Sequence, residues 1–299
     1  MRDRLALALV LGAVMLALGG TACGERSEPT GATVRLYPVT VSRSGAPPIV
    51  LDSEPPRVAA VTPPAVGVVH ALVGGKGERP AVLDQPDKID VDELRSFKPA
   101  LIVASAQADQ TELEQASRAT KAPVYVFPGD SIGDVEHGIT DLGLLLGREL
   151  KARKLVGEIE STRRFVQKRV AKLKKPSVFV DTGFFVTVPP NSLTGQLVDE
   201  AGGHNVAGIN VSASPFDLGR LARLNPDVYL ATSDSGTTLR DLRKSPRTRK
   251  LKAVRNGRFA IVQARLLEPG PRIGAGLLVI ARVLHPGALE AAPALPTSP

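Results

Sequence analysis

Side chains suited to holding a small ligand occur where apolar segments of the chain end. Arg265 precedes the turn-forming sequence EPGPR, and a guanidinium there can grip a carboxylate, catecholate or phosphate oxygen with two parallel hydrogen bonds. The alternatives for Arg265 are a surface position or a structural pair with Glu268. Arg272 lies at a helix start, and the alternative to a ligand-binding role for it is a structural one. The other candidates in such loops are Thr62, Pro63, Asp84, Gln107, Phe184 and Phe185, with one of the two phenylalanines expected in the core.

Signals for enzymatic or metal chemistry are missing from the sequence. The histidines, His70, His137, His204 and His285, share no metal-ligand spacing. The sequence has no G-x-S-x-G element, no P-loop and no dinucleotide fingerprint after a strand. We therefore expect a protein that is not an enzyme, with no catalytic residue, no metal site and no cofactor.

The sole cysteine, Cys23, lies at the end of a leader. A basic start and an apolar run over residues 5–18 have the architecture of a signal peptide, and small residues at 19–22 lead into Cys23. Small residues before a cysteine resemble the bacterial lipobox, in which the thiol is lipidated, although Gly20 stands where that pattern prefers leucine. We expect an extracytoplasmic protein anchored to the cell membrane through Cys23. The alternative is a plain secretory signal with an incidental cysteine.

The charge balance is basic, with a formal net charge of +8 and a dense run of Lys and Arg over residues 240–258. Such a run suits nucleic acid, but it lacks the aromatic interleaving of a nucleic-acid-binding surface. In an exported protein it is better explained as a solvated face near anionic polymer or lipid. We therefore expect no nucleic-acid partner.

The chain alternates short apolar strands with helices, which is typical of parallel βα units. A first strand at 37–41 can pair with residues 50–51. The first series has strands at 57–61, 80–83, 101–104 and 124–127, with helices at 65–73, 91–97 and 111–119 between them. The second series starts at 178–180 and has further strands at 228–231 and 259–262, followed by a last helix at 273–284.

Between the two series lies a long helical pattern. Apolar residues recur at three- to five-residue steps from 132 to 174, and Pro176 ends the pattern. A single helix of about 35 residues would span roughly 50 Å at 1.5 Å per residue. We expect one continuous helix here.

An internal repeat flanks this helix. Its two copies are residues 91–104 (VDELRSFKPALIVA) and 218–231 (LGRLARLNPDVYLA). Their apolar residues occupy matching positions, and Pro99 of the first copy matches Pro226 of the second. Each copy is a short helix, a break before proline and a buried strand, because the residue before proline leaves the helical region. Chance similarity between two βα units is the alternative.

The repeat and the helix together predict an α/β fold of two Rossmann-like lobes joined by one long α-helix, with a ligand cleft between the lobes. We expect a lipoprotein signal peptide at 1–23, a tether with N-terminal strands at 24–56, an N-terminal lobe at 57–131, the backbone helix at 132–175, a C-terminal lobe at 176–286 and a disordered tail at 287–299.

An ordered set of segments resembles the periplasmic iron-siderophore and cobalamin (Fe/B12) substrate-binding proteins of ABC transporters, whose lobes are joined by one backbone helix. The segments are YPVTV at 37–41, KPALIVAS at 98–105, NPDVYLATS at 225–233, AGGHNVAG at 201–208 and EPGPRIGAGLLVIARVLHP at 268–286. They cover nearly the whole mature chain in the family's order. Gly67 stands where the family often has glutamate in its ligand loop.

The resemblance implies a monomeric receptor that captures an iron chelate or a corrinoid-like molecule and delivers it to an ABC permease. One acidic residue per lobe would dock on the permease, and these positions fall on Asp92, with Glu93 beside it, and on Gly219, with Asp217 the nearest acid. The uncharged Gly219 departs from the pattern. The alternative is a degenerate member that acts as an envelope interaction or sensory lipoprotein without transport.

Overall fold

The computed structural model describes residues 37–43, 47–74 and 80–289. The predicted signal peptide with Cys23, the tether before residue 37 and the tail from residue 290 lie outside these residues. At the start of the described chain, β1 (Val39–Val41) pairs antiparallel with β2 (Ile49–Leu51), with Thr40 opposite Val50. The strand pair expected from the sequence is confirmed.

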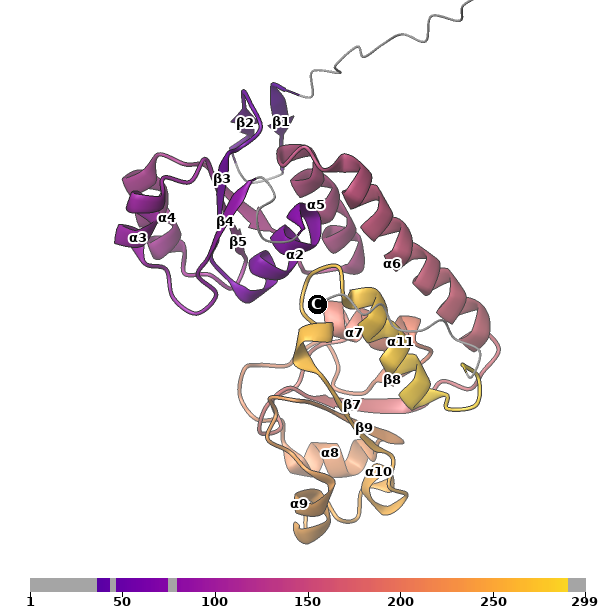
Figure 1. The fold of residues 1–299 in the computed structure, drawn as a ribbon. Coiled ribbons are helices and arrows are strands. Elements are labelled where there is room, and N and C mark those ends of the chain that lie inside the picture. Colours follow the sequence, from indigo (N-terminus) through magenta and orange to yellow (C-terminus); the bar gives the residue numbers. More distant parts are fainter. Residues whose placement is uncertain (1–36, 44–46, 75–79, 290–299) are drawn as a thin grey trace, which may run out of the picture. The chain divides into compact units, whose positions relative to one another are not determined.

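The first lobe is built on a four-stranded parallel sheet (Figure 1). The strands are β3 (Arg57–Ala60), β4 (Ala81–Asp84), β5 (Leu101–Ser105) and β6 (Val124–Phe127), in the order β4-β3-β5-β6. Its helices are α2 (Pro63–Val73), α3 (Val91–Phe97) and α4 (Gln110–Thr120). The central strand β5 is buried along its whole length, as expected of a strand covered on both faces.

The second lobe has a parallel sheet of the same strand order. Its strands are β7 (Ser177–Asp181), β8 (His204–Asn205), β9 (Val228–Thr232) and β10 (Phe259–Val262), in the order β10-β9-β7-β8. Its helices are α7 (Leu193–Glu200), α8 (Leu218–Leu224), α9 (Leu239–Lys244), α10 (Lys252–Arg255) and α11 (Ile273–Leu284), with a 3-10 turn at Ala264–Leu266. In each lobe the first strand lies between the second and the third, so the two-lobed α/β fold is confirmed.

The internal repeat extends to the caps of its helices. Asp90 caps α3, and its carboxylate accepts hydrogen bonds from the backbone N–H groups of Asp92 and Glu93. Asp217 caps α8 in the same way. Each helix then ends on a left-handed residue, Lys98 in one copy and Asn225 in the other, directly before proline. The matching caps and breaks support duplication of one βα unit.

The prediction of one continuous helix over residues 132–175 is wrong in one respect, because this segment forms two helices. They are α5 (Ile132–Leu145) and α6 (Glu149–Val170). Gly147 between them has φ of +64°, a left-handed conformation that ends α5 and that glycine adopts without a steric cost. The carbonyls freed by the break accept hydrogen bonds, that of Leu145 from the hydroxyl of Tyr37 and that of Leu146 from Arg148. The periodic spacing of apolar residues does not reveal such a break in a helix.

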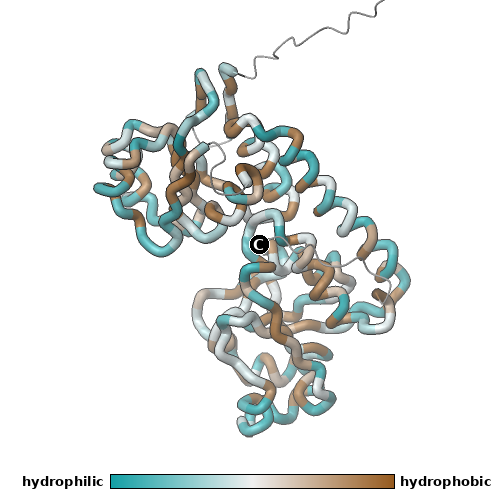
Figure 2. The backbone as a smooth tube through the Cα atoms, in the orientation of Figure 1, coloured by the Kyte–Doolittle hydropathy of each residue, from teal (hydrophilic) through white to brown (hydrophobic). Residues whose placement is uncertain are grey.

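α6 connects the two lobes. It contacts α5 on one side of the break and α11 in the second lobe. A Cβ added to Gly143 of α5 would lie 2.3 Å from Ala152 of α6, so the two helices are closely packed. One hydrophobic cluster runs from Val58 in the first lobe through Ile159 in α6 to Ile280 in α11. Figure 2 shows hydrophobic residues concentrated in the strands, whereas hydrophilic and hydrophobic residues alternate along α6.

Candidate functional site

A cavity of about 390 Å³ lies where loops of both lobes meet. Every lining segment follows a strand or leads from one into a helix. The lining residues are Gln107, Gly129 and Asp130 of the first lobe and Val188, Pro189, Asn191, Ser192, Leu193, Thr194, Leu267 and Pro269 of the second. Ligands of parallel α/β sheets bind in this position, outside the carboxyl ends of the strands.

The lobes touch at the wall of this cavity. A Cβ added to Gly129 would lie 2.3 Å from Cγ of Pro269, so the two loops are in close contact. Gln196 of α7 forms a second link, because its side-chain amide donates to the carbonyl of Asp130 and accepts from the N–H of Ile132. The cavity is therefore framed by direct contacts between the lobes.

The lining combines apolar residues with neutral polar ones and is nearly uncharged. Side chains of Gln107, Asn191, Ser192 and Thr194 offer amide and hydroxyl groups, and Asp130 is the only charged residue of the set. No lysine or arginine lines this cavity. Such a lining suits amide, hydroxamate and hydroxyl groups of a ligand better than several carboxylates.

Of the predicted ligand-binding residues, Gln107 lines the cavity and the others do not. The hydroxyl of Thr62 is buried and accepts hydrogen bonds from the N–H groups of Ala65 and Ser105, which caps α2 and ties it to β5. Pro63 is exposed in the first turn of α2. The carboxylate of Asp84 pairs with His70 at 2.8 Å. The side chains of Thr62 and Asp84 therefore have structural partners that the sequence did not indicate.

Phe184 and Phe185 form an unusual turn after β7. Their φ values are +48° and +67°, in a region that bulky residues rarely occupy. Phe184 is 76% exposed, whereas Phe185 packs against the core of the second lobe. One aromatic ring is thus core and the other open to solvent. Strained backbone of this kind is found mostly at functional sites, where the surrounding structure maintains it.

The turn is held by Asp181, a residue that sequence reasoning missed. Asp181 is fully buried at the end of β7. One carboxylate oxygen accepts from the N–H groups of Gly183 and Phe185 at 3.0 Å, and the other accepts from the hydroxyls of Tyr229 and Thr237. Burial and the adjacent Asp181 raise the pKa of Tyr229, so its hydroxyl stays a donor. The sequence signal that could have identified Asp181 was an acidic residue at the end of an apolar strand.

The two predicted arginines lie near the loop that carries Leu267 and Pro269. Arg265 is exposed and donates to the side-chain carbonyl of Gln263 at 2.8 Å. Arg272 precedes α11, and a Cβ on Gly67 of α2 would lie 3.2 Å from its Nη2. The guanidinium of Arg272 therefore lies against the helix in which the family's glutamate is replaced by glycine.

The predicted docking residues differ between the lobes. The side chain of Asp92 is 87% exposed on α3 and pairs with Arg95. Glu93 accepts a hydrogen bond from Gln85 at 2.7 Å. Asp217 instead uses its carboxylate as the cap of α8, at 2.6 Å from the N–H of Arg220.

Neither a cluster of metal-ligating side chains nor a membrane-spanning helix occurs in the part of the chain that the structure describes. Among the described residues, no three or more His, Cys, Asp or Glu side chains come together as ligands for a metal ion. Within the same ranges, no helix combines the length and apolar character needed to cross a membrane.

Residues 188–194 supply most of the second lobe's share of the cavity, and the sequence did not point to them. They contain no charged or aromatic side chain. The available signal was Ser192, which caps α7 by accepting from the N–H of Gly195. A loop that ends at a helix cap beside the edge of a parallel sheet is a common place for a ligand site.

Comparison with known proteins agrees with this architecture. The family model described as "Periplasmic binding protein" matches residues 56–266. An uncharacterised ABC transporter substrate-binding lipoprotein of Bacillus subtilis is 23% identical over 93% of this chain and 96% of its own length. A cobalamin-binding protein of Halobacterium salinarum is 25% identical over 83% of this chain and 74% of its own length.

A solved structure shares the fold. The ABC transporter substrate-binding protein of Listeria monocytogenes superposes with a TM-score of 0.66 at 20% identity, over 79% of this chain and 100% of that chain. The family is one of solute-binding proteins and not of enzymes. The chain therefore belongs to the periplasmic binding protein family, as an ABC-transporter substrate-binding protein of the Fe/B12 class that its sequence resembles.

Proposed function

We propose that this protein captures an iron chelate or a corrinoid-like molecule in the cavity between its lobes and delivers it to an ABC permease. The observation that carries the proposal is the cavity itself, which is lined by strand-end loops of both lobes. A ligand bound there contacts both lobes at once. Ligand binding therefore favours the state in which the two lobes touch each other. Iron that is already wrapped in a chelator needs no protein ligands.

The cavity lining narrows the class of ligand. Its amide and hydroxyl side chains suit a hydroxamate chelate or the amide arms of a corrinoid. Phe184 is available to contact an apolar part of the ligand, since its ring is exposed on a turn that Asp181 holds in place. Arg265 adds a positive charge outside the cavity lining, two residues before the lining residue Leu267.

Delivery requires a membrane position and a docking surface. We propose that Cys23 carries the lipid anchor, that the protein acts as a monomer outside the cytoplasm, and that Asp92 and Glu93 approach basic residues of the permease. Complementary charges at such an interface contribute orientation and encounter rate more than affinity.

The second lobe favours an alternative function. Its α8 bears Arg220 and Arg223, Gly219 is uncharged, and the carboxylate of Asp217 is engaged as a cap. A family member without a docking acid in this lobe would serve as an envelope interaction or sensory lipoprotein. Failure of the ligand-bound protein to stimulate ATP hydrolysis by the reconstituted transporter would favour this alternative.

A thermal-shift panel of hydroxamate siderophores, catecholate siderophores, haem and cobalamins tests ligand capture. A ligand present at about 100 times its Kd stabilises the folded state by roughly 2.7 kcal/mol, which raises the melting temperature. We expect the largest rise with a hydroxamate chelate or a corrinoid, and a smaller rise for Phe184→Ala. Arg265→Ala is expected to weaken an anionic ligand, and unchanged affinity would remove Arg265 from the site. If no ligand in the panel raises the melting temperature, the capture proposal fails.

A further inference from the structure

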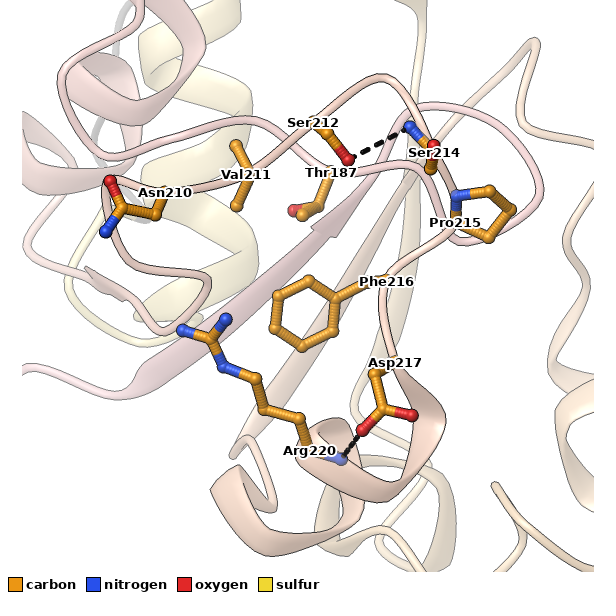
Figure 3. Close-up of a pocket in the computed structure, with 9 residues that line it drawn as sticks. All are labelled: Thr187, Asn210, Val211, Ser212, Ser214, Pro215, Phe216, Asp217 and Arg220. Atoms are coloured by element: carbon orange, nitrogen blue, oxygen red, sulfur yellow. Dashed lines mark hydrogen bonds between the residues drawn. The ribbon is translucent and has the colours of Figure 1, made fainter.

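A second cavity, of about 160 Å³, lies entirely within the second lobe (Figure 3). It shares no lining residue with the cavity between the lobes, although Thr187 of one precedes Val188 of the other in the chain. It is formed by the loop between β8 and α8 and by the loop after β7. Its lining residues are Thr187, Asn210, Val211, Ser212, Ser214, Pro215, Phe216, Asp217 and Arg220.

Thr187 supplies a buried hydroxyl without a partner. The residue is 5% exposed, and among the described residues its Oγ1 is the buried side-chain polar atom that makes no hydrogen bond. Leaving a buried polar group unpaired costs free energy, so such groups are almost always satisfied in a functional state. A ligand in the cavity that Thr187 lines would provide the missing partner.

Arg220 supplies a positive charge at the same cavity. Its guanidinium lies 5.0 Å from the centre of the Phe216 ring and donates one hydrogen bond to the carbonyl of Ala207. No carboxylate pairs with this guanidinium in the part of the chain that the structure describes. In Figure 3 the guanidinium extends away from the carboxylate of Asp217, which faces the backbone N–H of Arg220 instead. The remaining donors of Arg220 are therefore available to a ligand.

Glycine at position 208 keeps space for this arginine. A Cβ there would lie 3.2 Å from Nη2 of Arg220, and the φ of +79° disfavours any other residue. The ring of Phe216 is held in turn against Phe179, with ring centres 5.3 Å apart. The position of the guanidinium is thus supported by residues of the loop between β8 and α8 and, through Phe216, by the core.

We propose that this cavity is a second binding site, for a small oxyanion such as a carboxylate or inorganic phosphate. The anion accepts hydrogen bonds from the guanidinium of Arg220 and from the hydroxyl of Thr187. Asn210, Ser212 and Ser214 border the same cavity and offer further donors. Guanidinium groups bind both kinds of oxyanion in a bidentate manner, and the small volume excludes a siderophore or a corrinoid.

Calorimetric titration of the full mature chain with acetate, citrate, phosphate and sulfate, each as its sodium salt at constant ionic strength, tests the site. We expect one of these anions to bind at one site per chain. Arg220→Gln is expected to weaken that binding about tenfold or more, because it removes a charged hydrogen-bond donor. The matched control is Arg223→Gln, which removes an equal charge from the same helix at an exposed residue outside the cavity.

Thr187→Val distinguishes a ligand-binding role of the Thr187 hydroxyl from a structural one. The valine has nearly the same shape and removes the unpaired hydroxyl, so the anion-free variant should melt at the same temperature as the wild type or higher. Its affinity for the anion should nevertheless fall. A lower melting temperature without the anion would mean that the hydroxyl has a structural partner, and the site would lose this ligand group.

The proposal is overturned if none of the four anions binds, or if Arg220→Gln and Arg223→Gln weaken binding equally. These outcomes are separate from those for the main cavity, since Arg220→Gln should leave the thermal shift from a siderophore or cobalamin unchanged. Comparison of acetate and citrate with phosphate and sulfate identifies which oxyanion the site prefers.

Discussion

At the scale of single residues, two hydrogen-bonded carboxylates lie at opposite ends of the second lobe's sheet. Asp181 accepts from four donors at the end of β7, and these bonds position two residues that have positive φ values. Asp227 acts at the opposite end of the same sheet. Its carboxylate accepts from the N–H and the hydroxyl of Ser177 and pairs with Lys252, which ties the start of β9 to β7 and α10.

Asp227 gives a prediction about pH. The hydrogen bond from Lys252 and those from Ser177 lower the pKa of Asp227 from 3.8 to about 2. A group whose pKa is lower in the folded state stabilises the protein above its unfolded pKa, and this stability is lost as the pH falls towards the folded pKa. Asp227→Asn keeps an acceptor but removes the charge, and we expect it to cost about 1 kcal/mol at pH 7.

Urea denaturation of the wild type and of Asp227→Asn, followed from pH 7 to pH 2, checks this prediction. The difference in unfolding free energy should be constant above about pH 5 and should shrink between about pH 4 and pH 2. Asp199→Asn is the control, because Asp199 pairs with Lys175 at the surface with 68% of its side chain exposed. A difference for Asp227→Asn that does not change with pH would contradict the charge argument.

At the scale of elements, one arginine links α5 and α6 to α7 of the second lobe. Arg163 of α6 donates to both carboxylate oxygens of Glu200 in α7, at 2.9 and 2.7 Å, and to Glu136 in α5 at 3.0 Å. The side chains of the two glutamates are only 15% and 18% exposed. The hydrogen bonds to these carboxylates raise the pKa of Arg163. Planar, bidentate pairing is the geometry in which arginine differs from lysine.

We expect Arg163→Ala to destabilise the protein by about 2–3 kcal/mol, because it leaves two half-buried carboxylates without their donor. Guanidinium chloride denaturation measures the change. Arg164→Ala is the matched control on the same helix, since Arg164 pairs with Glu160 in an exposed bridge that is worth about 0.5 kcal/mol or less. Equal losses for the two variants would show that Arg163 makes no special contribution.

The sequence predicted the elements better than the site, and for physical reasons. α3, β6, β10 and α11 begin and end where the hydrophobic pattern and the prolines place them. The break at Gly147 was not predicted, because a single left-handed glycine leaves the apolar period intact on both sides. The cavity loop at 188–194 was not predicted either, because its neutral polar residues become a site only when the two lobes meet.

At the scale of the whole molecule, the proposed function depends on how closely loops of the two lobes approach. The contact of Gly129 with Pro269 and the hydrogen bonds of Gln196 lie beside the lining of the cavity. Both contacts set backbone of residues 129–132 directly against a second-lobe side chain, so little can be added at Gly129 without separating the loops. The proposed capture of a ligand by both lobes therefore requires glycine at position 129.

Gly129→Ala tests this requirement. The added methyl would lie 2.3 Å from Cγ of Pro269, closer than real Cβ contacts, so one of the two loops must move. We expect the variant to bind the ligand found in the thermal-shift panel about tenfold more weakly, which corresponds to roughly 1.4 kcal/mol. Isothermal titration calorimetry measures the affinity, and circular dichroism checks that the fold is retained.

Gly133→Ala is the control for this variant. Its methyl would lie 3.7 Å from the Oγ of Ser131, which is an ordinary contact, and alanine favours the helical conformation of α5. We therefore expect Gly133→Ala to bind the ligand like the wild type and to be equally stable or more stable. If Gly129→Ala also binds like the wild type, the contact with Pro269 does not form in the ligand-bound state, and the ligand is held without close approach of the two loops.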